Sequence, residues 1–172
     1  MENNIQTFTV AIADADFDRR LEIERHLKGE IGIVLLSDDG INDSVTDPAI
    51  ARRTLRSRSE VTASENEVAR IKLLKPLVLV VNLNRCNDED YAFLLSLHHA
   101  SPDARMILLI DDSIDEGQII RILQIGARGY LNYENAWLHL PMAIRVVGRG
   151  EAWVPRKMLG SIIDHMLKTS IN

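Results

Sequence analysis

The chain has 172 residues, of which 46% are hydrophobic and 26% are charged, which is the composition of a globular domain with enough core to fold alone. Its formal net charge of −5 argues against a dedicated nucleic-acid-binding domain, because such domains carry a basic stripe. No apolar run approaches the roughly 18 residues of a membrane span, and the N-terminus lacks the pattern of a signal peptide. The single cysteine, Cys86, excludes an intramolecular disulfide and favours the cytoplasm.

Five short apolar segments predict β-strands. Their hydrophobicity is continuous and does not alternate, as in strands that are buried on both faces of a parallel sheet. The predicted strands cover 8–13, 31–36, 77–81, 104–110 and 128–131.

Helical patterns lie between these strands. Residues 19–28 set apolar side chains four apart among charged ones, and 87–100 follow an acidic first turn with an apolar face. A further helix is predicted within 138–150, where Pro141 must lie in the first turn because proline cannot donate a helical hydrogen bond. This alternation predicts a doubly wound α/β fold of the flavodoxin-like kind.

Two serine–glutamate pairs have the spacing of a capping box, in which each side chain bonds the backbone of the other residue. Ser64 and Glu67 predict a helix over about 65–75. Ser113 and Glu116 predict the start of another helix after the fourth strand.

About 40 residues separate the second and third strands, more than one helix with two loops requires. We interpret 38–63 as an insert that extends over the C-terminal edge of the sheet. Within its arginine-rich part, 48–58, Arg52, Arg53 and Arg56 would share a face of a helix. Such a face suits an acidic partner or a phosphate backbone, although a solvated arginine face is the commoner outcome.

The C-terminal segment predicts an additional helix. Its apolar residues form a broad stripe, which must be covered by the domain itself, by a second copy or by a following domain. The stripe consists of Met158, Leu159, Ile162, Ile163, Met166 and Leu167.

Three segments resemble a known family. "SPDARMILLI", "IGARGYL" and "AIRVVGRGEAWVP" are similar to the second half of a bacterial response-regulator receiver domain, of the variety that precedes a LuxR/NarL-type helix-turn-helix. The likeness covers about 8–168, except 37–76. It implies a CheY-like, flavodoxin-like five-stranded parallel sheet with an extra C-terminal helix. It also implies a receiver-like domain at 1–152 and, at 153–172, a linker helix leading toward a DNA-binding domain absent from this chain.

A phosphorylatable receiver of this family presents an aspartate nucleophile after the third strand and an acidic pair after the first strand that helps to hold Mg²⁺. A hydroxyl residue ends the fourth strand, and a lysine ends the fifth. On this chain the nucleophile falls on Asn82, the hydroxyl on Ile110 and the lysine on Tyr133. At the acidic pair Asp14 is kept, and Asp16 follows one residue later than the family pattern.

These replacements change the chemistry that the resemblance implies. The amide of Asn82 cannot form an acyl phosphate, while Ile110 and Tyr133 remove the donor and the cation that stabilise a transferred phosphoryl group. The resemblance therefore implies a degenerate receiver, or pseudo-receiver, with no catalytic residue and no cofactor. Asp14 and Asp16 remain weak candidates for binding Mg²⁺, although the commoner outcome is that they are solvated at the edge of the sheet and cap the following helix. Tyr130, in contrast, matches the aromatic residue that the family uses in switching.

We interpret the chain as a non-enzymatic, phosphorylation-independent receiver domain of an atypical two-component response regulator that controls transcription through protein contacts. The expected partner is a second copy, bound through the fourth helix, fifth strand and fifth helix (116–149) or through the C-terminal helix. DNA would be bound only through the absent helix-turn-helix domain.

Two other functions stay open. The remodelled cleft of Asp14, Asp16, Asn82, Cys86 and Tyr133 could serve a small-molecule or redox sensor, although an inert free cysteine is the commoner outcome. Phosphotransfer to a neighbouring aspartate is disfavoured, because the rest of the pocket is absent. The candidates for that role are Asp88 and Asp111.

Overall fold

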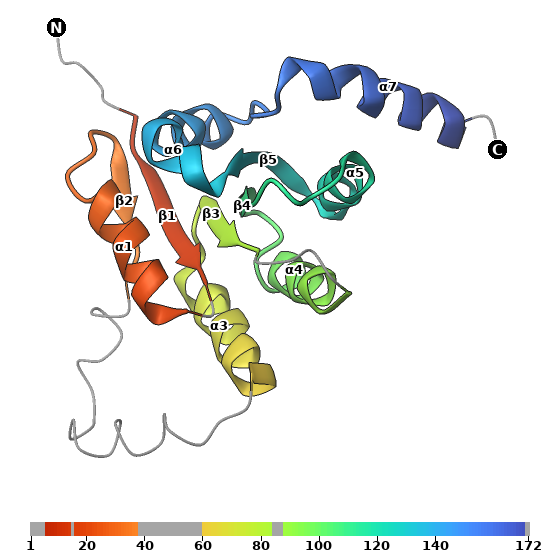
Figure 1. The fold of residues 1–172 in the computed structure, drawn as a ribbon. Coiled ribbons are helices and arrows are strands. Elements are labelled where there is room, and N and C mark those ends of the chain that lie inside the picture. Colours follow the sequence, from red (N-terminus) through yellow and green to blue (C-terminus); the bar gives the residue numbers. More distant parts are fainter. Residues whose placement is uncertain (1–5, 15, 38–59, 84–87, 171–172) are drawn as a thin grey trace, which may run out of the picture.

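The computed structural model describes residues 6–14, 16–37, 60–83 and 88–170. Within these ranges a five-stranded sheet has the strand order β2-β1-β3-β4-β5, and helices cover both of its faces (Figure 1). The strands are β1 (Phe8–Ala13), β2 (Ile33–Leu35), β3 (Val78–Asn82), β4 (Arg105–Ile110) and β5 (Ala127–Asn132). The helices are α1 (Phe17–Leu27), α3 (Glu60–Leu74), α4 (Asp88–Ala100), α5 (Glu116–Ile125), α6 (Tyr133–Gly148) and α7 (Arg156–Ser170).

All neighbouring strands of this sheet pair in parallel. The chain runs from β1 outward to β2, returns to the other side of β1 as β3, and continues outward through β4 and β5. This is the predicted flavodoxin-like, CheY-like doubly wound sheet, and the extra C-terminal helix is present as α7.

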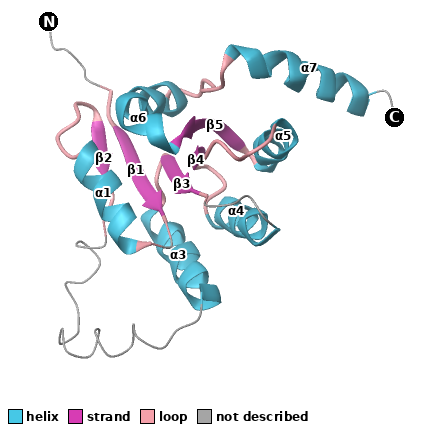
Figure 2. Ribbon diagram, in the orientation of Figure 1, coloured by secondary structure: helices cyan, strands magenta, loops and turns pink. Residues whose placement is uncertain are grey.

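The core consists of two apolar layers, one on each face of the sheet, and helices cover each of them (Figure 2). Under α1 and α6, the side chains of Ile23 and Ile144 pack against Val10 and its neighbours. Under α3, α4 and α5, the side chains of Leu94 and Ile122 pack against the opposite face. Burial on both faces explains why the strands read as continuous apolar runs in the sequence.

Helix α6 corrects the prediction for Pro141. The helix starts at Tyr133, capped by Asn132, so Pro141 lies in its interior and not in its first turn. Proline has no N–H, and an interior proline leaves the carbonyl four residues earlier, that of Trp137, without its helical donor. The Nε2–H of His26, on α1, donates to this carbonyl over 2.6 Å. The histidine therefore satisfies the carbonyl that Pro141 leaves without a helical donor.

The predicted capping residue of α5 is also corrected. The N-cap is Asp115, whose carboxylate accepts from the Gln118 backbone N–H while the Gln118 side chain accepts from the Asp115 N–H. The capping box therefore lies two residues beyond the predicted one. Ser113 instead donates to the carboxylate of Asp111 in the preceding turn.

Helix α3 is longer than predicted. It begins at Glu60, so Ser64 lies within the helix and does not cap it. The last four residues of the predicted insert belong to this helix. The rest of the insert, including its arginine-rich part, lies outside the described residues.

The segment after α6 returns to the sheet. Trp153 forms a parallel bridge with Gly129 of β5, in which the Tyr130 N–H donates to the Trp153 carbonyl over 3.1 Å. Gly129 is required there, because a Cβ would lie 2.6 Å from the Trp153 carbonyl oxygen. Helix α7 then packs beside α5, where the side chains of Gln124 and His165 are hydrogen-bonded at 2.9 Å. Of the helices in the described ranges, none is long and apolar enough to cross a membrane.

Candidate functional site

The C-terminal ends of the parallel strands meet at one edge of the sheet, next to the point where the chain reverses its winding between β1 and β3. Ligands of open α/β sheets bind at such points. Four of the predicted site residues lie along this edge: Asp14 after β1, Asn82 at the end of β3, Ile110 at the end of β4 and Tyr133 after β5.

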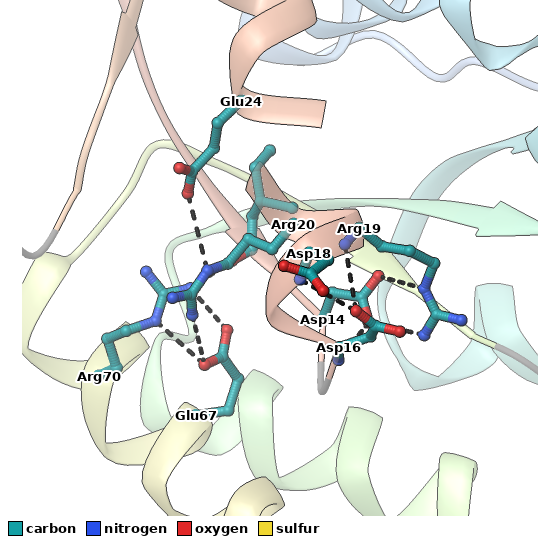
Figure 3. A network of polar contacts seen from close by, with 9 residues as sticks. Asp14, Asp16, Asp18, Arg19, Arg20, Glu24, Glu67 and Arg70 are labelled. Atoms are coloured by element: carbon teal, nitrogen blue, oxygen red, sulfur yellow. Dashed lines mark hydrogen bonds and ion pairs between the residues drawn. The ribbon is translucent and has the colours of Figure 1, made fainter. Parts of the chain in front are cut away.

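Asp14 is the buried charge of this edge, with only 3% of its surface exposed. Arg19 of α1 binds it through two hydrogen bonds, from Nη2 to Oδ1 over 2.9 Å and from Nε to Oδ2 over 3.1 Å. The Asn82 amide donates to Oδ2 over 2.8 Å, and the Asp16 backbone N–H donates to Oδ1 over 2.8 Å. Figure 3 shows the guanidinium approaching the carboxylate edge-on. Both carboxylate oxygens are therefore occupied by donors of the same chain.

The electrostatics of this pair favour its charged form. The hydrogen bond with Asp14 is the main cause that raises the pKa of Arg19 above its ordinary value, and the charge of the same carboxylate adds to it. Two-pronged arginine–carboxylate pairs are among the strongest hydrogen-bonded pairs in proteins. One guanidinium balances one carboxylate, and the neutral amide of Asn82 adds a donor without adding charge.

The side chain of Asp16 bonds the backbone of α1. Its Oδ1 accepts from the backbone N–H groups of Asp18 and Arg19, at 3.0 and 3.2 Å, and so caps α1. The capping role weighed for Asp16 is confirmed. Asp14, expected to be solvated if it bound no metal, is instead buried and paired. In the part of the chain that the structure describes, no group of three or more His, Cys, Asp or Glu side chains is arranged to hold a metal ion.

A cavity of about 140 Å³ lies at the same edge, lined by Arg19, Asn82, Leu83, Asp111 and Tyr133. It is smaller than the roughly 300–1,000 Å³ of a typical small-molecule site, but it has room for ordered water. Burial is the main cause that raises the pKa of the Tyr133 phenol, and the charge of Glu22 adds to it. Tyr133 is therefore neutral at pH 7, where a lysine would be charged.

Ile110 and Tyr130 do not line this cavity. Both are buried, with 4% and 9% of their surfaces exposed, and both line a second cavity beside α5. Asp111 borders both cavities, and its hydrogen bonds from Ser113 lower its pKa. Asp88 is not among the lining residues of either cavity. Cys86 lies outside the described residues.

Arg19 is the residue that sequence reasoning missed. The N-terminal turn of a helix favours acidic residues because of the helix dipole, yet α1 carries Arg19 and Arg20 there. Two cations at the unfavourable end of a helix indicate specific acidic partners. This signal indicates an acidic partner, but it does not by itself identify Asp14, five residues earlier in the sequence.

Arg20 takes part in a second buried network beside the first (Figure 3). Its Nη1 lies 3.2 Å from Glu67 of α3, and Arg70 contacts the same carboxylate at 2.5 Å. Arg70 also donates to the carbonyl of Ile12. Since β2 pairs only with the first half of β1, this carbonyl lies beyond the part of β1 that pairs with β2, and Arg70 supplies its donor.

One curated protein and several solved structures are similar to this chain. No family model matches the chain. The oxygen regulatory protein NreC of Staphylococcus epidermidis is 29% identical over 112 residues, which cover 63% of this chain and 51% of that protein. The chain thus spans about half the length of this curated relative.

Solved structures of low sequence identity share the fold. The isolated REC domain of RcsB from Salmonella enterica serovar Typhimurium, in the apo form, superimposes with a TM-score of 0.65 at 14% identity, over 92% of this chain and 99% of that one. A two-component response regulator of the LuxR family from Aurantimonas sp. SI85-9A1 gives a TM-score of 0.65 at 12% identity, over 94% and 99% of the two chains. At these identities the likeness shows the fold, and the chemistry of the site must be argued from its geometry.

Proposed function

We propose that this chain, which has the receiver fold and resembles the receiver domains of LuxR/NarL-type response regulators, is a phosphorylation-independent receiver that regulates transcription through protein contacts. It is not an enzyme in this proposal. Its signal is carried by a change in conformation or association, because the strand-edge site lacks the groups that receive and hold a phosphoryl group.

The observation that carries the proposal is the pairing of Asp14 with Arg19. A receiver of this family would direct the corresponding carboxylate at Mg²⁺, which requires oxygen ligands that are free to coordinate. Here both oxygens of Asp14 accept hydrogen bonds from the chain itself. The residues present do not fit the ion, and the guanidinium already supplies the positive charge that this carboxylate needs.

The remaining positions support the same conclusion. Asn82 directs its amide nitrogen at Asp14 over 2.8 Å, and an amide is not the carboxylate nucleophile of an acyl phosphate. Ile110 offers no hydroxyl. Tyr133 is a neutral phenol in place of a lysine, so no ammonium lies where the transferred charge would develop.

Treatment with acetyl phosphate and Mg²⁺, followed by intact-protein mass spectrometry, tests the proposal. We expect no mass increase in the wild type and no stoichiometric labelling of Asn82→Asp, because Ile110 and Tyr133 remain. The triple variant Asn82→Asp/Ile110→Thr/Tyr133→Lys is the matched control, in which the nucleophile, hydroxyl and lysine positions carry the family's residues. A stoichiometric, hydroxylamine-sensitive phosphate on the wild type would overturn the proposal.

The proposed location, association and DNA-related role rest on the similarity to known response regulators. Among the similar solved structures, RcsB of Salmonella typhimurium is described in relation to DNA interaction, and two RcsB dimers are described bound to two parallel DNAs. By analogy we propose that this domain lies in the cytoplasm, associates with a second copy, and influences DNA binding only through a separate helix-turn-helix domain. The boundary between the receiver part (1–152) and the linker helix (153–172) belongs to this proposal.

The sensor alternative in the strand-edge cleft has no observation that favours it. The 140 Å³ cavity is small for an organic ligand. A redox role for Cys86 stays a prediction.

A further inference from the structure

A second cavity, of about 780 Å³, lies on the α5 side of the sheet. One wall is formed by the ends of β4 and β5, by the loop that follows β4 and by α5. The other wall is formed by the segment from Ala152 to Pro155 and the first turn of α7. The bridge between Trp153 and Gly129 fixes this segment against β5, so the cavity is built from both the receiver core and the C-terminal extension.

The inner surface of this cavity is mostly apolar. Four side chains that are at most 9% exposed contribute to it, from β4, from the loop before α5, from α5 and from α7: Ile110, Ile114, Ile119 and Met158. Its volume lies within the roughly 300–1,000 Å³ typical of sites for small organic molecules. An apolar body could pack against these buried side chains here.

A buried phenol lies in the same lining. Tyr130 is only 9% exposed, and no hydrogen bond to its hydroxyl is present among the residues that the structure describes. The hydroxyl oxygen is not among the buried polar atoms that lack a partner, so it is open to the cavity, where water or a ligand can form a hydrogen bond with it. Glu116, at the start of α5, lines the cavity too. Its charge, together with burial, raises the pKa of Tyr130, so the two groups interact electrostatically.

The charged groups of the lining are predominantly acidic. Asp111, Asp112 and Glu116 are carboxylates, whereas Lys157 is cationic. Asp111 accepts hydrogen bonds from Ser113, and Asp112 accepts one from Asn132. The carboxylate of Glu116 therefore remains the acceptor that is best placed to bind a ligand cation next to Tyr130.

We propose that this cavity binds an organic amine: an aromatic or cage-like apolar body with a protonated amino group. The ammonium contacts the Glu116 carboxylate and donates to the Tyr130 hydroxyl, and the body packs against the buried isoleucines and Met158. This site is distinct from the strand-edge site, and the proposal holds whether or not Asn82 can be phosphorylated. Because α7 forms part of the wall, a bound amine would stabilise the contact between α7 and α5.

Calorimetric titration of the full chain with tryptamine, phenethylamine and adamantylamine tests the proposal, with indolepropionate as the anionic analogue of tryptamine. We expect saturable binding of at least one amine and at least about tenfold weaker binding of the anion, a difference of about 1.4 kcal/mol. Hydrogen exchange in α7 should slow when the amine is bound. Equal binding of tryptamine and indolepropionate, or no saturable binding of any amine, would overturn the proposal.

Variants locate the binding. Glu116→Gln should abolish the preference for the amine over the anion, and Ile119→Trp should block binding by filling the cavity. Glu89→Gln, an exposed carboxylate on α4 outside this lining, is the matched control and should bind like the wild type. Circular dichroism checks that each variant is folded. If Glu116→Gln retains the full preference for tryptamine, the assignment of the cation site is wrong.

Discussion

At the scale of single residues, the pair of Asp14 and Arg19 determines what the strand edge can do. A carboxylate that is 97% buried must be paired or hydrogen-bonded to remain charged. The chain meets this requirement internally, with two hydrogen bonds from Arg19, one from Asn82 and one from the backbone of Asp16. The amide of Asn82 is therefore also a structural feature, because it donates where a second carboxylate would repel Asp14.

The substitution Arg19→Ala tests this interaction. It leaves the buried carboxylate with two of its four donors, and we expect the free energy of unfolding to fall by roughly 1.5–3 kcal/mol, the range for hydrogen bonds to charged groups. We expect no larger loss of unfolding free energy, because the side chain of Arg19 is 32% exposed and water can partly replace it. Urea denaturation measures it, with Arg25→Ala, an exposed arginine on the same helix, as the control. A loss no larger than that of Arg25→Ala would show that the pair contributes little.

Part of this site could be predicted from the sequence. Asp14, Asn82 and Tyr133 lie at the predicted edge, because the ends of parallel strands must meet there whatever the details of the loops. The partner of Asp14 was not predicted, because the two residues are joined by a turn whose backbone geometry no periodicity encodes. Ile110 lies at the end of its predicted strand, but its side chain lines a different cavity.

Among the secondary-structure elements, α6 lacks one of its own hydrogen bonds, and a side chain of another helix replaces it. Pro141 leaves the Trp137 carbonyl without a helical donor, and His26 of α1 supplies one. The rings of His26 and Trp137 also meet edge-on, with centroids 5.2 Å apart, and Trp137 contacts Tyr133 in the same way at 5.8 Å. A proline in the middle of one helix thus creates a specific contact with another helix.

A double-mutant cycle tests this compensation. In the wild type, His26→Ala should lower the free energy of unfolding by about 1 kcal/mol, because it removes the hydrogen bond to the Trp137 carbonyl. In the Pro141→Ala background the helix supplies its own donor, so the same change should cost clearly less. Chemical denaturation of the four proteins gives the coupling energy. Equal effects of His26→Ala in both backgrounds would refute the compensation.

Strands were easier to predict than helix ends. Each predicted strand overlaps the observed one, because burial on both faces leaves a continuous apolar run that few other structures produce. The ends of α3 and α5 were misplaced. Serine and aspartate both cap helices, and the backbone of the turn before α5 decided in favour of Asp115 over Ser113. The interior proline of α6 could not be predicted, because its compensating donor comes from a distant helix.

At the scale of the whole molecule, α7 presents an apolar surface. Met158 is buried against the domain, as expected if the domain covers part of the stripe. Four other residues of the stripe remain exposed by 48–62%: Leu159, Ile163, Met166 and Leu167. Helix α6 exposes a smaller apolar surface at Leu138 and Met142. Both surfaces belong to the regions that were predicted to bind a second copy.

Sedimentation equilibrium of two charge-introducing variants distinguishes these surfaces. We expect Ile163→Lys on α7 to raise the dimer dissociation constant by at least about tenfold, equivalent to about 1.4 kcal/mol, because a buried lysine without a partner opposes association. Leu138→Lys on α6 is the matched control and should have a smaller effect. The reverse order would assign the interface to α6, and a wild type that stays monomeric at every concentration would contradict the proposed homodimer.

We propose that Arg19 occupies the side of Asp14 that Mg²⁺ would take in a phosphorylatable receiver. An NMR titration with Mg²⁺ and beryllofluoride tests it most directly, by following the side-chain N–H signals of Arg19 and Asn82. Both signals should stay unchanged, because neither ligand displaces the donors of Asp14. Saturable shifts of these two signals, with release of the Arg19 Nε–H from its hydrogen bond, would show a working phosphate-analogue site and overturn this proposal.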